Sequence, residues 1–422
     1  MRLGVVADDL TGGADAAGIL AARGARVRLA VGVPGRPDDG AAGAVVVALR
    51  SRSAPVAEAV ADSLAALAWL RAGGAERVLL KVCSTFDSTP QGNIGPVALA
   101  MLDALGAPGA AVCPAFPANG RTLYQGHLFV GDRLLSESGM ERHPLTPMTD
   151  PDLRRWLSLQ TGEPTGHLPL DALRAGLGAD RLARERAEGR RLAIVDALED
   201  ADLLRLAEAT AGDALLVGGS AAAQGMPALM GLSGRGAEGR PVGGAATGPG
   251  LALAGSCSAA TRAQVAVHAA RHPTLRLDPA EAASEAADEA FARARAFLAA
   301  HRHERPLVYS SAAPDEVARA QGALGRDEVA RGLDALFARL GWAARLDGFG
   351  ALVVAGGETS GAVAGALGEE AWDVGAEIVP GVPTRHPCSA PDGSGFGLVL
   401  KSGNFGGEGF LDAALDALAA GR

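Results

Sequence analysis

Short apolar runs recur through the first half of the chain, and alanine-rich stretches of helical length separate several of them. The runs occupy residues 2–7, 27–31, 44–49, 78–82 and 110–113. The alanine-rich stretches occupy residues 56–72 and 95–105. Apolar runs this short predict buried strands. Strands that alternate with helices predict a parallel sheet covered by helices, which is the strongest constraint on the fold.

The same alternation continues to the other end of the chain, interrupted by a glycine-rich segment at 231–250 that reads as a linker. Further strands are predicted at 191–196, 214–218, 251–254, 306–310, 350–355 and 397–400, and helices near 200–211, 280–300 and 361–368. A chain of 422 residues also exceeds what one core usually serves. We therefore expect an α/β protein of two α/β domains with largely parallel sheets and an active-site cleft between them. The predicted parts are a domain at 1–235, a Gly-rich linker at 236–250 and a domain at 251–422.

Charge and composition exclude several classes of protein. The net charge of −9 argues against a general nucleic-acid or membrane-surface binder. Apolar runs end well before 18 residues, and Asp8 and Asp9 interrupt the first, so we expect no membrane span and no signal peptide. The four cysteines lie far apart and indicate reduced thiols in a cytoplasmic enzyme. A homodimer is expected from base rates alone.

Lysine and asparagine are rare, and their positions are informative. The only lysines are Lys81 and Lys401, and the only asparagines are Asn93, Asn119 and Asn404. All five fall within residues 81–125 or 401–407. This clustering supports functional sites there, where arginine cannot replace a compact ammonium group or where an amide must both donate and accept.

Polar residues follow the first predicted strand directly. In the segment ADDLTGGAD (7–15), the carboxylates of Asp8 and Asp9 stand where open α/β sheets bind ligands. Paired carboxylates there can accept hydroxyl groups, take a proton or hold Mg²⁺. The alternative is that one of them only caps the following helix, and Asp15 is expected to be structural.

A second polar loop leaves the strand that ends near Lys81. It supplies an ammonium group, a carboxylate at Asp87 and hydroxyl groups at Ser84 and Thr85, a density that suits a polyhydroxylated acid. A solvated turn with caps is the alternative. In a third segment, PAFPANGRT (114–122), Arg121 can grip a carboxylate and Asn119 can hydrogen-bond a substrate, although Asn119-Gly120 also makes a good turn.

Three small-residue loops each follow a predicted strand of the second half, at 255–262, 355–361 and 401–407. Small residues let phosphate groups approach backbone N–H groups at a helix start, so three such loops predict a nucleotide pocket. None fits the Walker A pattern, and no dinucleotide-binding glycine fingerprint follows the first strand.

These segments together resemble the four-carbon acid sugar kinase family, and within it the 3-oxo-tetronate 4-kinase branch. The resemblance rests on ADDLTGGADAA (7–17), KVCSTFDSTPQGNIGPV (81–97), the long segment 114–150, GSCSAATRAQV (255–265), AGGETSGAV (355–363) and LKSGNFGGEGF (400–410). It implies a sugar-acid domain, a nucleotide domain, and transfer of the ATP γ-phosphoryl group to the C4 hydroxyl of 3-oxo-tetronate, with Mg²⁺ accompanying ATP. It places ATP contacts on Ser258, Gly356, Gly357, Glu358, Thr359 and Gly403.

The chemistry of the first-half loops completes the prediction. Asp9 or Asp87 accepts the hydroxyl proton, and Lys81 and Arg121 hold the substrate carboxylate and keto oxygen. Asp8, Ser84, Thr85 and Asn119 are the remaining candidate substrate contacts. The alternatives are a D-threonate or D-erythronate 4-kinase, a non-catalytic sensor that binds ATP and a sugar acid, or an oxidoreductase, which the missing dinucleotide fingerprint disfavours.

Residues 381–397 depart from the family pattern because they are longer and more polar than expected. We expect a surface insertion there, without a function for His386 or Cys388.

Overall fold

The computed structural model describes residues 2–38, 40–143, 145–233, 245–310, 326–379, 381–388, 395–401 and 403–421. The chain divides into two compact units, unit 1 (Met1–Gly239) and unit 2 (Arg240–Arg422). Each unit is a largely parallel sheet with helices, so the predicted α/β class is confirmed. Most of the predicted linker lies outside the described residues.

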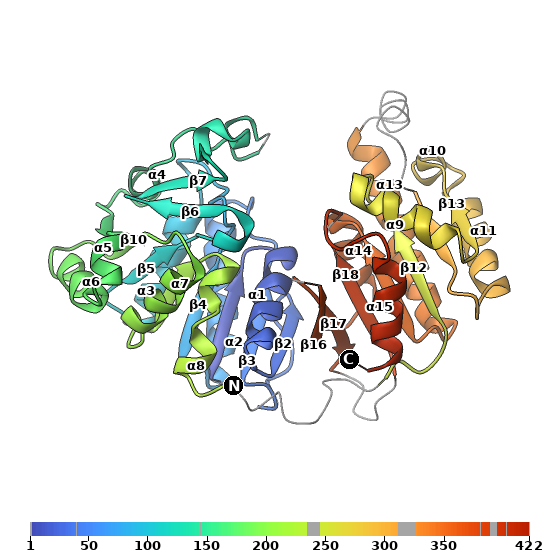
Figure 1. Ribbon diagram of the computed structural model, residues 1–422, viewed down its shortest axis with the longest axis horizontal. Helices are drawn as coiled ribbons and strands as arrows, with labels where there is room; N and C mark the ends of the chain where they lie inside the picture. Colours follow the sequence, from blue (N-terminus) through green and yellow to red (C-terminus); the bar gives the residue numbers. More distant parts are fainter. Residues whose placement is uncertain are drawn as a thin grey trace. The chain divides into compact units, whose positions relative to one another are not determined.

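The described part of unit 1 contains one parallel sheet of eight strands (Figure 1). In sheet order they are β2 (Val27–Val31), β3 (Ala44–Ala48), β1 (Leu3–Ala7), β4 (Arg77–Lys81), β11 (Leu215–Gly218), β5 (Ala110–Cys113), β10 (Leu192–Val195) and β9 (Gly166–Leu168). The central strands β3, β1 and β4 are buried along their whole length. Burial on both faces explains why these strands read as continuous apolar runs in the sequence.

Helices follow the strands of this sheet, as expected for parallel connections. They are α1 (Leu10–Ala22), α2 (Val56–Ala72), α3 (Ile94–Leu105), α4 (Leu153–Thr161), α5 (Leu170–Arg174), α6 (Gly178–Ala187), α7 (Asp200–Ala209) and α8 (Met226–Leu229), with a 3-10 turn η4 (Ser220–Ala223). The side chain of Asp9 accepts a hydrogen bond from Gly12 N and starts α1, whereas Gly106, at φ 61°, ends α3. Asp15 lies within α1 and contacts Ser220.

Part of the segment 114–150 forms a small antiparallel sheet that was not predicted from the sequence. Its strands are β6 (Arg121–Tyr124), β7 (His127–Val130) and β8 (Arg133–Leu134), and the short helices η1 (Pro117–Asn119), η2 (Leu135–Glu137) and η3 (Met140–Arg142) flank it. Gln125 and Gly126 connect β6 to β7 at φ 49° and 73°. Two successive left-handed residues are what a tight hairpin requires.

Unit 2 has a second sheet with a different edge. In order, its described strands are β13 (Thr274–Arg276), β14 (Leu307–Tyr309), β12 (Gly250–Ala254), β15 (Ala351–Ala355), β18 (Gly397–Lys401), β17 (Val382–Pro387) and β16 (Ala371–Val379). The first five are parallel, and β17 is antiparallel to both neighbours. The helices are α9 (Ala259–Ala269), α10 (Pro279–Ala282), α11 (Ala287–Ala300), α13 (Arg326–Leu346), α14 (Gly357–Ala366) and α15 (Phe410–Ala419).

Two predicted helices of unit 2 have different bounds in the structure, and the prediction of a surface insertion was wrong. The helix expected at 280–300 is two helices, α10 and α11, and the helix expected at 361–368 already begins at Gly357. The surface insertion expected at 381–397 contains the buried strand β17, in which Arg385 is 1% exposed. Charged and proline residues concealed this strand, because its burial comes from pairing with β16 and β18 on either side and not from an apolar run of its own. Residues 389–394 lie outside the described part.

Among the described helices, none combines the length and the apolar character needed to cross a bilayer.

Candidate functional site

The carboxyl ends of three neighbouring strands bring together the main polar groups of unit 1. Strand β1 pairs in parallel with β3 and with β4, and Ala7 stands opposite both Ala48 and Lys81. The residues that follow these strands therefore emerge at one edge of the sheet, where open α/β sheets bind ligands.

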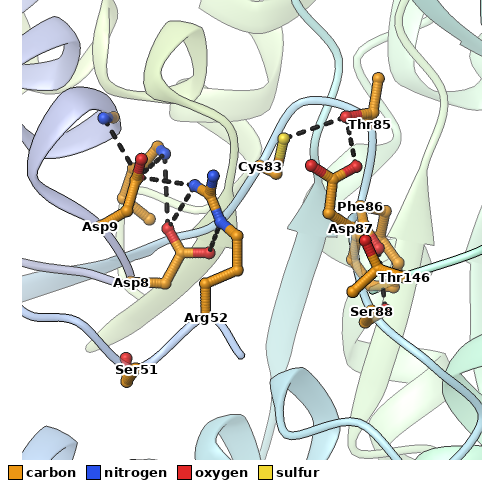
Figure 2. A network of polar contacts seen from close by, with 12 residues as sticks. Asp8, Asp9, Ser51, Arg52, Cys83, Thr85, Phe86, Asp87, Ser88 and Thr146 are labelled. Carbon is orange, nitrogen blue, oxygen red and sulfur yellow. Dashed lines mark hydrogen bonds and ion pairs between the residues drawn. The ribbon is translucent and has the colours of Figure 1, made fainter. Parts of the chain in front are cut away.

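Four charged side chains at this edge form one network, which we call the carboxylate cluster: Asp8, Asp9, Arg52 and Lys81. Arg52 donates two hydrogen bonds to Asp8, at 2.8 and 2.9 Å, and one to Asp9, at 2.6 Å (Figure 2). Lys81 Nζ lies 3.1 Å from Asp9 Oδ1 and 3.4 Å from Asp8 Oδ1. Two cations thus face two carboxylates, and the cluster is neutral overall.

A glycine makes room for the lysine. A Cβ atom at Gly12 would lie 1.5 Å from Lys81 Nζ and 2.5 Å from Asp9 Oδ1. Lys81 therefore reaches Asp9 only because residue 12, in the first turn of α1, has no side chain. Gly12 of ADDLTGG thus serves the geometry of the cluster, whereas a Cβ atom at Gly13 would lie 2.9 Å from Ala48 Cβ, so Gly13 permits close packing on the strands.

Burial and charge oppose each other in the pKa values of the cluster. Burial by itself raises the pKa of Asp8, but the charges of Lys81 and Arg52 and the hydrogen bond from Arg52 outweigh it, and this pKa is lowered. Burial likewise lowers the pKa of Lys81, but Asp8 and Asp9 outweigh it and raise this pKa. Both groups are therefore ionised at neutral pH, and the site presents fixed charges.

A second polar group lies in the loop after β4. Thr85 Oγ1 donates to Asp87 Oδ1 at 2.6 Å, and Cys83 Sγ lies 3.0 Å from the same hydroxyl (Figure 2). Because the hydroxyl hydrogen goes to Asp87, the thiol is the donor to Thr85. Ser84 lies half-buried in the same loop.

The loop that carries Asp87 is strained and firmly held. Phe86 is fully buried at φ 56°, a left-handed conformation that costs a bulky residue about 1–3 kcal/mol. Ser88 donates to Phe86 O and accepts hydrogen bonds from Trp156 and Gln160 of α4. The α4 contacts hold the strained backbone, so the Asp87 carboxylate is positioned in advance.

Arg52 is the residue of this site that the sequence analysis missed. It lies between Ser51 and Ser53, just after the predicted strand 44–49, and this polar segment at a strand end is the signal that could have identified it. Asn93, which did stand out as one of three asparagines, holds the Arg52 loop by donating to Ser51 O at 2.7 Å and to Ala54 O at 3.1 Å.

Asn119 and Arg121 lie farther along the sheet. They follow β5, which is separated from β4 by β11. Arg121 donates to Asn119 O, and no described contact joins either residue to the carboxylate cluster. Their role in substrate binding stays a prediction.

In unit 2, three neighbouring strands bring the glycine loops together. Strands β12, β15 and β18 are adjacent, with Ala254 opposite Ala355 and Ala355 opposite Lys401. Ser258, the N-cap of α9, donates from Oγ to Gly403 O at 2.6 Å. The predicted nucleotide residues of all three loops thus meet at one edge.

A cavity of about 270 Å³ opens beside the first two of these loops, those at 255–262 and 355–361. Its lining includes Gly255, Ser256, Cys257, Ser310, Asp334, Gly356, Gly357, Glu358 and Thr359. A Cβ atom at Gly255 would lie 2.2 Å from Thr359 Oγ1, and one at Gly403 would lie 2.3 Å from Ser256 Oγ, so both glycines permit close loop packing. A Cβ atom at Gly357 would meet no protein atom within 4 Å.

Two features of the cavity fit a nucleotide with a divalent cation. The hydroxyl oxygen of Ser310 is buried and has no hydrogen-bond partner among the described residues. Asp334 and Glu358 supply carboxylates, the oxygen ligands that Mg²⁺ takes in proteins. Burial raises the pKa of Asp334 despite a hydrogen bond from Thr359, and Glu358 raises it further. A cation at this position would relieve that repulsion.

The ammonium group of Lys401 contacts the third glycine loop. Its Nζ lies 3.2 Å from Thr261 Oγ1 and 3.1 Å from the carbonyl oxygens of both Gly403 and Phe405. Burial lowers the pKa of Lys401 to about 8.

Comparison with known proteins identifies the kind of domain that each unit forms. A model of a sugar-binding N-terminal domain matches residues 3–226, and a model of a nucleotide-binding C-terminal domain matches residues 251–411. The fold and the matched domains together define a two-domain protein of the sugar-kinase class.

Full-length relatives make the family specific. The chain is 47% identical to a 3-oxo-tetronate kinase of Burkholderia multivorans and 48% identical to one of Cupriavidus necator, in each case over 99% of this chain and 97% of the relative. A solved structure from Salmonella typhimurium LT2 matches with a TM-score of 0.91 at 37% identity, covering 98% of both chains. One from Haemophilus influenzae matches with a TM-score of 0.86 at 38% identity, covering 98% of this chain and 100% of the other. The chain belongs to the four-carbon acid sugar kinase family, as its sequence predicted.

Proposed function

We propose that this protein is an ATP-dependent kinase that phosphorylates the C4 hydroxyl of 3-oxo-tetronate, forming 3-oxo-tetronate 4-phosphate and ADP. Relatives named 3-oxo-tetronate kinase, 41–48% identical over nearly the whole chain, support the reaction. The observation that carries the proposal is the carboxylate cluster, because it places two cations and two carboxylates at the ligand-binding edge of the unit matched by a sugar-binding model.

The cluster has the groups that a short sugar acid requires. Arg52 and Lys81 are cations that can share an incoming carboxylate or keto oxygen, and Arg52 has the fork geometry for bidentate binding. The oxygens of Asp8 and Asp9 accept hydrogen bonds from sugar hydroxyls. Arg121, with Asn119, stays a candidate for a second contact to the substrate.

Of the two candidate bases, the contacts favour Asp87. Asp9 Oδ1 accepts hydrogen bonds from Arg52, Lys81 and Gly12 N, so three donors already occupy this oxygen. The described contacts of the Asp87 carboxylate consist of one hydrogen bond from Thr85, which leaves the second oxygen for a substrate hydroxyl. We therefore assign proton acceptance to Asp87 and positioning of Lys81 to Asp9.

On the nucleotide side, the proposal uses backbone groups and Mg²⁺. The N–H groups at the start of α9 and α14 can bind phosphate oxygens, with Ser258, Gly356, Gly357, Glu358, Thr359 and Gly403 as the predicted ATP contacts. Asp334 and Glu358 would hold the Mg²⁺, which supplies charge neutralisation of the triphosphate. The transfer itself requires little covalent help from the protein.

The decisive test is turnover of the Asp87→Asn and Asp9→Asn variants. We expect Asp87→Asn to lower kcat at least about a hundredfold, because general base catalysis contributes on the order of 10²–10⁴. Asp9→Asn should also lower kcat and should raise KM for the sugar acid. ATP binding, measured by calorimetry, should survive in both. Asp132→Asn, at an exposed position in unit 1, is the matched control. Near-normal kcat in Asp87→Asn would refute its role as the base.

A substrate panel separates the remaining alternatives. ADP release with 3-oxo-tetronate should exceed release with D-threonate or D-erythronate, which differ by one carbonyl or one stereocentre. A sensor predicts no substrate-dependent ADP release, and an oxidoreductase predicts a change in nicotinamide absorbance. Light scattering of the purified protein tests the predicted homodimer, and cell fractionation tests the predicted cytoplasmic location.

A further inference from the structure

Three side chains of unit 2, away from the glycine loops, converge on a point between two helices. They are His268 near the end of α9, His272 just after it, and Asp412 in the first turn of α15. The helices α9 and α15 pack against each other (Figure 1). His268 Nδ1 lies 2.9 Å and His272 Nε2 lies 3.0 Å from the same carboxylate oxygen, Oδ1 of Asp412.

The opposite nitrogen of each imidazole identifies its tautomer. His268 Nε2 lies 2.9 Å from Arg305 O, and His272 Nδ1 lies 3.1 Å from Glu304 O. A carbonyl oxygen only accepts, so each of these nitrogens carries the hydrogen. In the neutral imidazoles, the nitrogens that face Asp412 therefore expose lone pairs toward a carboxylate oxygen that also exposes lone pairs.

Three lone-pair donors this close together require a positive charge among them, which either a proton on an imidazole or a metal ion would supply. His268 is 1% exposed, and neither its Nδ1 nor Asp412 Oδ1 has a hydrogen-bond partner among the described residues, although the two atoms are 2.9 Å apart. The close approach is therefore not aligned as a hydrogen bond. Arg271 contacts the other carboxylate oxygen, Oδ2, at 3.5 Å and leaves Oδ1 directed at the two imidazoles.

We propose that His268, His272 and Asp412 bind a transition-metal ion, with Zn²⁺ the expected occupant. All three ligand atoms lie within 4.8 Å of one another. Ligands about 2.0–2.1 Å from a tetrahedral zinc ion are about 3.3 Å apart. The two imidazole nitrogens lie 2.9 and 3.0 Å from Asp412 Oδ1, close to that value. Two imidazoles and one carboxylate suit zinc, whereas Mg²⁺ takes oxygen ligands.

The surroundings of the three ligands match those of protein metal sites. Metal-binding histidines donate their second N–H to a backbone carbonyl or carboxylate, which fixes the ring, and both imidazoles do so here. The side chains of His272 and Asp412 are 20% and 16% exposed, which leaves a path for the ion and a water as fourth ligand.

The proposed ion is separate from the Mg²⁺ of the kinase reaction. Ten residues of helix separate Ser258 from His268, about 15 Å at 1.5 Å per residue. An ion here would tie the end of α9 to the start of α15 and, through the imidazoles, to the backbone at 304–305. Its function is therefore structural, and it does not depend on the proposed kinase activity.

The test is Zn²⁺ binding to tag-free full-length protein that has been stripped with a chelator. We expect one Zn²⁺ per chain in competition with a chromophoric chelator, a rise in melting temperature, and no comparable response to Mg²⁺. Co²⁺ should give the visible absorption of a tetrahedral site.

His272→Ala and Asp412→Asn should each weaken Zn²⁺ binding at least about tenfold. Mutation of groups that only hydrogen-bond to a metal ligand already lowers metal affinity roughly 10–100-fold. Both positions are partly exposed, so these variants are better suited than His268→Ala to retain the fold. The matched control is His303→Ala, at an exposed histidine of the same unit. Wild-type protein that takes up no Zn²⁺, or uptake that His272→Ala and His303→Ala leave equally intact, would overturn the proposal.

Discussion

The two polar sheet edges of this protein are built by opposite means. In unit 1, the edge formed by β3, β1 and β4 carries fixed side-chain charges, with Lys81 only 4% exposed between two carboxylates. In unit 2, the edge formed by β12, β15 and β18 carries glycines, hydroxyl groups and backbone N–H groups. The difference follows the proposed ligands, because a short acid with hydroxyls needs placed charges, whereas phosphates bind to backbone amides.

Glycines contribute to both edges, for different physical reasons. Gly12 leaves the space that a charged side chain occupies, and Gly255 leaves the space that lets one loop pack on another. Gly357 differs from both, since no protein atom would meet its Cβ within 4 Å. An alanine substitution at each of these positions is therefore expected to impair a different property of the protein.

The largest effect is expected from Gly12→Ala. The new methyl group would overlap Lys81 Nζ and force it away from Asp9. We expect kcat to fall at least about a hundredfold, since small displacements of positioning groups cost on the order of 10²-fold. Steady-state kinetics with the sugar acid would measure this loss. Gly212→Ala, where a Cβ atom meets nothing, is the control, and equal activity of the two variants would show that the cluster tolerates a displaced lysine.

A smaller and more selective effect is expected from Gly357→Ala. The protein itself has room for the methyl group, so the melting temperature should stay unchanged. If phosphate groups approach the backbone at the start of α14, the ATP Kd should rise about tenfold, equivalent to about 1.4 kcal/mol. Calorimetric titration with ATP measures it, with Gly409→Ala as the control in the same unit. An unchanged Kd for ATP would contradict a contact between the nucleotide and this loop.

The smallest effect concerns stability rather than turnover. The pKa of Asp8 is lower in the folded protein than in the unfolded chain, because Lys81 and Arg52 outweigh the effect of burial. Its stabilising contribution is therefore present above its unfolded pKa and is lost as the pH falls through the folded pKa.

Urea unfolding of the wild type and of Asp8→Asn at several pH values tests this contribution. The wild type should be the more stable at pH 7, and the difference should shrink as the pH falls below about 4, the unfolded range of aspartate. A difference that stayed constant with pH would contradict ionic stabilisation by the cluster.

Local patterns in the sequence predicted much of the fold correctly. The predicted runs at 27–31 and 110–113 are β2 and β5, and the predicted helix at 56–72 is α2, because an apolar run or a helical composition is complete within its own segment. Strand β17 was missed because its burial depends on other segments of the chain. Its Arg385 and His386 become buried only because β16 and β18 lie on either side.

The sequence by itself determined the family, the α/β class and the loops that carry the proposed chemistry, because these depend on residues near one another in the chain. Only the tertiary structure decided the partners: Arg52 beside Asp8, Gly12 beneath Lys81, and Asp412 between His268 and His272. In the sequence, Asp8 and Arg52 are 44 residues apart, Gly12 and Lys81 are 69 apart, and His268 and Asp412 are 144 apart. Contacts across such separations depend on strand order and helix packing, which no short segment encodes.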